Sequence, residues 1–130
     1  MIGPRTIRDA ADRIGRYIHR TPVLTCQSID RISRCQVFFK AENLQKAGAF
    51  KSRGAMNAVL SLTNDQAVKG VCTHSSWNHA QALARAASLR GIPAYIVMPR
   101  TAPGIKVAAV REYGGQITFC EPTLEARETT

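Results

Sequence analysis

The 130-residue chain has few aromatic residues and no long apolar run. Trp, Tyr and Phe make up only 6% of it, so the core must come mainly from Ala, Val, Ile and Leu. No uninterrupted apolar stretch approaches the roughly 18 residues that a membrane-spanning helix needs. The first five residues lack the apolar stretch of a signal peptide, and Asp9 and Asp12 are atypical of a transit peptide. We therefore expect a folded cytoplasmic chain of about one domain.

Acidic residues are also scarce, since nine Asp and Glu stand against 18 Lys and Arg, for a net charge of +9. Such an excess can indicate a nucleic acid, an anionic membrane surface or a small anionic ligand. The basic residues are scattered, and no aromatic residues interleave with them as a base-stacking platform requires. The pattern favours neither a nucleic acid nor a membrane as partner, although nucleic-acid binding stays open as a minor alternative.

The cysteines form no CxxC pair and no metal-ligand spacing with the three histidines, so we expect neither a disulfide nor a metal site. Cys72 and Cys120 lie in apolar runs that read as strands, where cysteine behaves as a small hydrophobe. We expect free, buried thiols. The four residues are Cys26, Cys35, Cys72 and Cys120.

Apolar spacing in the first half of the chain predicts mainly helices. A three- and four-residue repeat of apolar side chains predicts an amphipathic helix over residues 5–18. A short helix is expected at 28–32, a buried strand at 36–40 and a further helix at 51–62.

From residue 70 the pattern alternates strictly between strand and helix, with Gly91 in the usual position for ending a helix. Short links between alternating elements imply an α/β fold with a parallel sheet and right-handed crossovers. A last helix begins near residue 124, and nothing after it covers the third strand, so we expect a part of a larger chain. The expected strands are 70–74, 94–98 and 116–120, and the expected helices 78–90 and 105–113.

A polar loop over residues 73–79 follows the first of these strands. Open parallel sheets bind ligands beyond the carboxyl ends of their strands, and the N-terminus of the next helix attracts a carboxylate or phosphate. The alternative is that Ser75, Ser76 or Asn78 merely caps that helix.

A second candidate is Lys51, which stands at the start of a predicted helix. The positive end of the helix dipole there favours the uncharged amine, which a Schiff-base lysine requires. The alternative is an ordinary solvated surface lysine.

Together, residues 42–55 and 73–84 strongly resemble serine racemase and the serine/threonine dehydratases, which are pyridoxal-phosphate (PLP) enzymes of the tryptophan-synthase-β fold type (fold type II). The resemblance covers nearly the whole chain. It implies a three-layer α/β architecture, with residues 1–69 as the N-terminal part of the large cofactor domain and 70–130 as most of a truncated small βαβαβ domain. Further matches lie at residues 19–25, 91–99, 101–103 and 119–122.

The resemblance also implies roles for individual residues. Lys51 forms the Schiff base with PLP and moves the α-proton on one face of the cofactor, and Ser76 is the acid/base on the opposite face. Phe50 lies against the cofactor ring, and Asn78 bonds its ring hydroxyl. The implied substrate is serine or threonine, racemised or dehydrated, and relatives are commonly homodimeric. The substrate-binding residues are Ser75, Ser76, Asn78 and His79.

Two departures from the family pattern weigh on activity. Trp77 and Ala80 stand where the family's Ser-Ser-Gly-Asn-His-Gly loop has glycine, so we expect the indole to crowd the substrate or turn the loop outward. The family's glycine-rich phosphate loop and metal ligands come after residue 130. We therefore expect the isolated chain to bind PLP weakly and to be inactive. The alternative is a non-catalytic truncated homologue, either an unstable remnant or an interaction module that pairs with a full-length relative.

Overall fold

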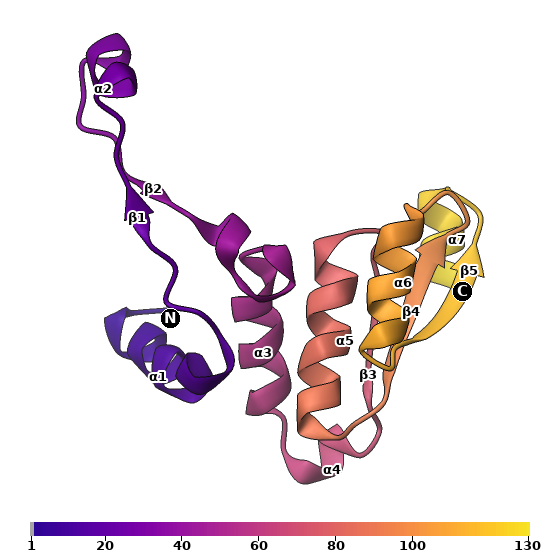
Figure 1. Cartoon of the computed structure of the whole chain (residues 1–130). Helices are drawn as coiled ribbons and strands as arrows, with labels where there is room; N and C mark the ends of the chain where they lie inside the picture. Colours follow the sequence, from indigo (N-terminus) through magenta and orange to yellow (C-terminus); the bar gives the residue numbers. More distant parts are fainter. Residues whose placement is uncertain (1) are drawn as a thin grey trace.

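The computed structural model describes residues 2–130 and combines a helical N-terminal half with a small α/β unit (Figure 1). The helices are α1 (Pro4–Ile14), α2 (Gln27–Ser33), α3 (Lys51–Ser61), α4 (Asn64–Ala67), α5 (Asn78–Arg90), α6 (Gly104–Glu112) and α7 (Leu124–Thr129). Single 3-10 turns are η1 (Gly15–Tyr17), η2 (Glu42–Leu44) and η3 (Lys46–Gly48). The strands are β1 (Val23–Leu24), β2 (Phe39–Lys40), β3 (Val71–His74), β4 (Ala94–Pro99) and β5 (Gln116–Cys120).

The α/β unit is a three-stranded parallel sheet in the order β3-β4-β5. Cys72 of β3 faces Tyr95 of β4, and Val97 of β4 faces Thr118 of β5. The parallel α/β architecture is thus confirmed. Gly91, in the left-handed region at φ 72°, ends α5 as expected.

The core lies where α3 packs on α5 and α5 packs on the sheet. Alanines on the facing helices let the backbones approach closely, which explains how a chain with few aromatics forms a dense interior. Longer side chains from α3, β4 and α6 fill the remaining space. The fully or almost fully buried members are Ala55, Met56, Val59, Ala80, Ala82, Ala84, Ala86, Ala87, Ile96, Met98 and Val110.

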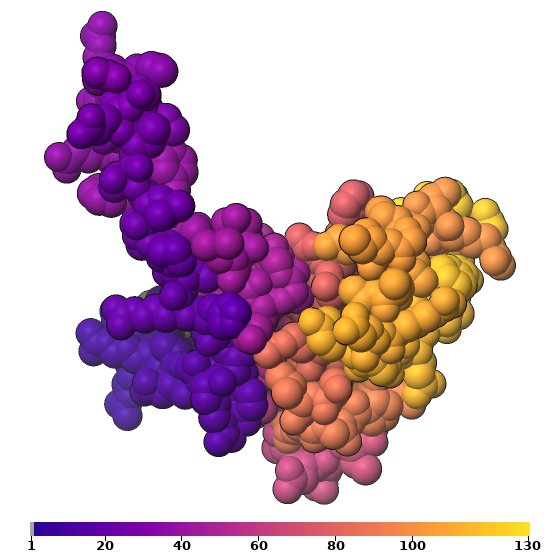
Figure 2. Space-filling view, viewed as in Figure 1, coloured from indigo at the N-terminus to yellow at the C-terminus, as the bar shows by residue number. Residues whose placement is uncertain are grey.

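The expected buried strand at 36–40 is wrong. Only Phe39 and Lys40 form a strand, which pairs antiparallel with β1 in a two-stranded ribbon that projects with α2 from the body (Figures 1 and 2). Phe38 is 66% exposed. The apolar residues at 37–39 led to the expectation of burial, but in the structure most of the Phe38 side chain is left uncovered.

The expectation of buried thiols holds for Cys120 alone. All four cysteines are free, as predicted, but Cys35 and Cys72 are exposed and Cys26 is half-buried. Cys72 lies on the open side of an edge strand whose exposure alternates from residue to residue. The first helix also ends at Ile14, followed by η1, instead of continuing to residue 18.

No helix of the described residues has both the length and the apolar character needed to cross a membrane.

Candidate functional site

Lys51 is the first residue of α3, and Phe50 precedes it at the N-cap. Both side chains are exposed, and the Lys51 Nζ lies 5.0 Å from the centre of the Phe50 ring. Within the described part of the chain, no hydrogen bond or ion pair engages this amine. The structure therefore presents an accessible lysine amine beside an aromatic face, held only by a contact with that ring.

The polar loop connects β3 to α5, as predicted. Ser75 and Ser76 follow the strand, and Asn78 and His79 are the first two residues of α5. No side chain caps α5, and the Ser75 hydroxyl instead accepts a hydrogen bond from the Trp77 N–H at 3.3 Å. The simple capping interpretation is therefore not supported, and the helix N-terminus keeps its attraction for an anion.

The lysine and the loop lie on neighbouring helices. The turn η3, just before Lys51, contacts α5, and α3 packs along α5. Partial burial lowers the pKa of His79 below its ordinary value, and the positive charge of Lys51 lowers it further. The contacts of η3 and α3 with α5 thus place Lys51 and His79 at the starts of two neighbouring helices. No hydrogen bond links Lys51 to Ser75, Ser76 or Asn78 in the described residues.

Sequence reasoning did not identify Lys106. Its Nζ, from α6, donates to Asn78 Oδ1 at 2.7 Å and to Gln81 Oε1 at 3.3 Å. Asn78 and Gln81 are three residues apart, so they share one face of an otherwise alanine-rich helix. This pair of polar residues in the sequence could have indicated that a basic side chain packs against α5 there. Because Lys106 engages the oxygen of Asn78, the NH₂ end of the amide remains free to donate.

Trp77 turns outward, with 60% of its surface exposed. Its φ of −132° is outside the left-handed region, so the glycine-to-tryptophan difference adds no backbone strain here. At the second of the two glycine positions, the Ala80 methyl group is fully buried in the core. The loop thus accommodates both departures from the family pattern.

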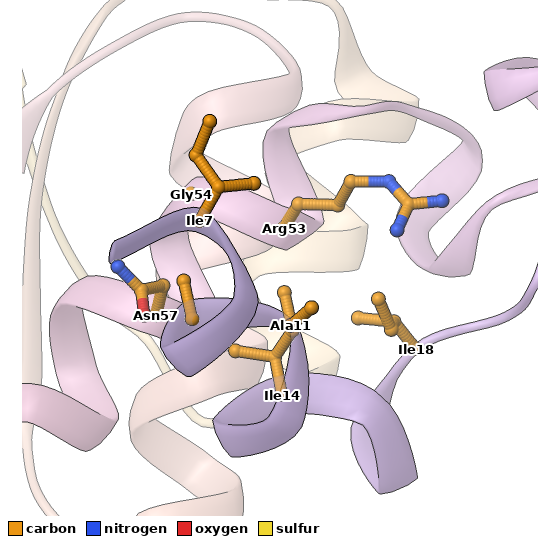
Figure 3. A pocket seen from close by; sticks show the side chains of 8 residues that line it. Ile7, Ala11, Ile14, Ile18, Arg53, Gly54 and Asn57 are labelled. Atoms are coloured by element: carbon orange, nitrogen blue, oxygen red, sulfur yellow. The ribbon is translucent and has the colours of Figure 1, made fainter. Parts of the chain in front are cut away.

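A cavity of about 330 Å³ lies apart from these residues, between α1 and α3 (Figure 3). Its polar side chains already have partners, since Asn57 Oδ1 accepts from Arg13 Nη1 at 2.6 Å and Arg53 is paired with Glu42. The cavity is therefore an apolar groove and contains none of the predicted site residues. Its apolar lining comes from Ile7, Ala10, Ala11, Ile14 and Ile18.

The donor set fits part of a pyridoxal group. Lys51 supplies an unpaired amine for the aldehyde, Phe50 an adjacent aromatic face, and Asn78 a free amide NH₂ for the ring oxygen. Within residues 2–130 no glycine-rich turn lies beside these groups to receive a phosphate. The same residues contain no cluster of three or more His, Cys, Asp or Glu able to hold a metal ion.

Comparison with known proteins shows the family to which the chain belongs. The sequence pattern of the family described as "Pyridoxal-phosphate dependent enzyme" matches residues 14–130. The chain is 59% identical to the serine racemase of Arabidopsis thaliana, over 95% of this chain and 37% of that protein. It is 55% identical to the β-hydroxyaspartate dehydratase of Paracoccus denitrificans, over 93% of this chain and 38% of that protein.

Solved structures show the same likeness. Maize serine racemase superposes with a TM-score of 0.91 at 54% identity, covering 96% of this chain and 38% of that one. The processed form of threonine deaminase isoform 2 from Solanum lycopersicum superposes with a TM-score of 0.81 at 29% identity. This match covers 98% of this chain and 37% of that one. The chain thus spans well under half the length of these relatives. It belongs to the family of pyridoxal-phosphate-dependent enzymes and shares the fold of serine racemase and threonine deaminase over the part that it covers.

Proposed function

We propose that this chain carries the cofactor-lysine part of a serine racemase-like or serine/threonine dehydratase-like site. The observation that supports this most is the Lys51 amine at the start of α3, which has no partner among the described residues and lies where η3 and α3 contact α5. Residues 1–69 would then belong to the large domain of such an enzyme and residues 70–130 to the small one. Serine racemases and a β-hydroxyaspartate dehydratase among the relatives point to a small hydroxy amino acid as substrate.

The proposed roles are those that the family resemblance implies, and the donors at these positions are compatible with them. Lys51 Nζ would hold the cofactor and, once the substrate amine has displaced it, would take or return the proton of the substrate α-carbon on one side. Phe50 lies against the cofactor ring, and Asn78, with its oxygen engaged by Lys106, donates its NH₂ to the ring oxygen. Pyridoxal phosphate, when bound, supplies the electron sink for the charge left at the α-carbon.

The start of α5 is the proposed anchor for the substrate carboxylate. Its N–H groups have no side-chain cap, and Ser75 and Ser76 add hydroxyls to the same turn. Partial burial, and then the charge of Lys51, lower the pKa of His79, which favours the neutral imidazole as a hydrogen-bonding group. Ser76 is the proposed acid/base on the side opposite Lys51. Proton transfer from two sides gives racemisation, and loss of the β-hydroxyl gives dehydration.

We further propose that the chain by itself binds the cofactor weakly and does not turn over serine. Backbone N–H groups in a glycine-rich turn are the usual cradle for a phosphate, and the described residues offer none near Lys51. A second candidate function is an interaction module that pairs with a full-length relative. The exposed apolar side chains of the projecting ribbon and of the residue before its second strand favour it, with Val23 55%, Leu24 53% and Phe38 66% exposed.

Reductive labelling tests the proposal. The chain is incubated with pyridoxal phosphate and reduced with borohydride, and peptide mass spectrometry then locates the pyridoxyl group among the five lysines. We expect preferential labelling of Lys51, lost in Lys51→Ala and retained in the control Lys69→Ala, whose lysine is also exposed. Uniform labelling of all lysines would contradict the cofactor role. Lys51-dependent pyruvate formation from serine would confirm the site and overturn the expected inactivity.

A further inference from the structure

The buried polar side chains of residues 2–130 all lie around the loop that leads into Lys51. Thr21, Gln45 and Ser52 are 4%, 4% and 2% exposed, and each is hydrogen-bonded. Burying a polar group is unfavourable unless it finds a partner, and a satisfied buried network restricts the local backbone to one arrangement. Their concentration at one place sets this loop apart from the remaining described chain.

Gln45 joins the loop to the segment after η1. Its Nε2 donates to the His19 carbonyl at 2.8 Å, and its Oε1 accepts from the His19 N–H at 2.8 Å and the Lys46 N–H at 2.9 Å. One amide side chain therefore pairs with both backbone groups of residue 19, as a neighbouring strand would. A side-chain amide carries a carbonyl acceptor and an NH₂ donor side by side, which matches this pairing.

Ser52 closes the loop from its other side. Its hydroxyl donates to the Lys46 carbonyl, so the residue directly after Lys51 is bonded to the beginning of η3. Between them, Ala47 and Gly48 adopt positive φ values of 55° and 64°. Alanine rarely takes this conformation, which persists where surrounding bonds hold it.

Arg53 holds the first turn of α3. Its guanidinium donates to both carboxylate oxygens of Glu42, at 2.6 and 2.8 Å, and the Thr21 hydroxyl donates to the same carboxylate at 2.6 Å. Both oxygens of this nearby carboxylate are therefore engaged with partners other than Lys51.

We propose that Gln45, Ser52 and the Glu42–Arg53 pair are positioning residues for Lys51. They fix the backbone on both sides of Lys51 and leave its amine without a partner. The proposal rests on the proposed function of Lys51, but the positioning can be measured without any cofactor. Gln45 is the strongest test, because its three hydrogen bonds join the loop to residue 19 and involve neither α3 nor α5.

The experiment compares Gln45→Leu with the matched control Gln66→Leu in the full 130-residue chain. Gln66 also bonds a backbone group, accepting from the Thr63 N–H at 2.9 Å, but it lies in α4, away from Lys51. Amide hydrogen exchange is measured well below each thermal midpoint. In Gln45→Leu we expect exchange of the Ser52 and Arg53 amides to speed up about tenfold, with α5 amides unchanged, because the opening is local.

The second readout is the ratio of reductive pyridoxyl labelling at Lys51 to that at Lys69 in the same molecules. We expect it to fall several-fold in Gln45→Leu and to stay constant in Gln66→Leu. Gln45→Glu, which keeps the acceptor but loses the donor, should give an intermediate ratio. Unchanged exchange at Ser52 and Arg53 in Gln45→Leu, or equal acceleration throughout α5, would overturn the positioning role. Local acceleration with unselective labelling of the parent chain would instead overturn the cofactor role of Lys51 alone.

Discussion

Arg53 donates two hydrogen bonds to the carboxylate of Glu42, which lies 11 residues earlier in the chain. The Arg53 Nη2 is 2.6 Å from Glu42 Oε1, and the Arg53 Nε is 2.8 Å from Glu42 Oε2. The pair connects the turn η2 to the first turn of α3. Together with the Thr21 hydroxyl, and despite partial burial, the Arg53 hydrogen bonds lower the pKa of Glu42 from 4.5 to about 2.

This lowered pKa predicts acid sensitivity. A carboxyl group whose pKa is lower in the folded state stabilises the fold at pH values above its pKa in the unfolded state. This stabilisation is lost as the pH falls from about 4.5 through about 2. Glu42→Gln should therefore lower the free energy of unfolding at pH 7 by about 1 kcal/mol, a modest figure because solvent reaches the pair. Urea unfolding at pH 7 and pH 3 measures this. Equal losses at the two pH values would show that the carboxylate charge is not involved.

The hydrogen bonds of Lys106 connect α6 to Asn78 of the candidate site, so we expect a change at Lys106 to affect that site. Lys106→Met removes the donor to Asn78 and Gln81, so we expect a loss of about 1 kcal/mol in the free energy of unfolding. The Asn78 side-chain amide should also become mobile, which its NMR relaxation reports. Lys69→Met is the control. A rigid Asn78 amide in Lys106→Met would mean that other contacts hold it.

The outward position of Trp77 predicts tolerance of glycine at this site. Because the indole is 60% exposed and φ is −132°, Trp77→Gly should change the free energy of unfolding by no more than about 1 kcal/mol. Thermal and urea unfolding measure the effect. A loss of several kcal/mol would show that the indole is packed in solution.

We expect the pKa of His79 to depend on the charge of Lys51. Burial and then the Lys51 charge lower the pKa of His79, so Lys51→Met should raise this pKa part of the way toward its ordinary value of 6.5. Because the neutral imidazole is the form favoured by the fold, stability should fall as pH drops below 6.5. An NMR titration of His79 measures the first effect. An identical pKa of His79 in the parent chain and in Lys51→Met would show that the Lys51 amine is too far from His79 to influence it.

The parallel sheet could be predicted because its signals are local. Alternating apolar runs and Gly91 located β3, α5, β4, α6 and β5 to within about two residues. The short helix α4 was not predicted, although Thr63 and Gln66 form a capping box that marks its start. Burial at 36–40 could not be predicted, since it depends on what packs over the ribbon.

The candidate site was predicted only in part for the same reason. Lys51 and the 75–79 loop each stood out in the sequence, but the distance between them is set by packing of α3 on α5. Lys106 lies 28 residues from Asn78, and Gln45 lies 26 residues from His19, so no spacing rule connects either pair.

Fluorescence of Trp77, the single tryptophan of the chain, tests most directly whether Lys51 holds pyridoxal phosphate beside the start of α5. Bound pyridoxal absorbs where indole emits, so a group attached at Lys51 quenches Trp77 by energy transfer, which weakens steeply as the two groups separate. We predict saturable quenching by pyridoxal phosphate in the parent chain and in Lys69→Ala, and its loss in Lys51→Ala. Quenching of equal depth and affinity in Lys51→Ala would contradict the account.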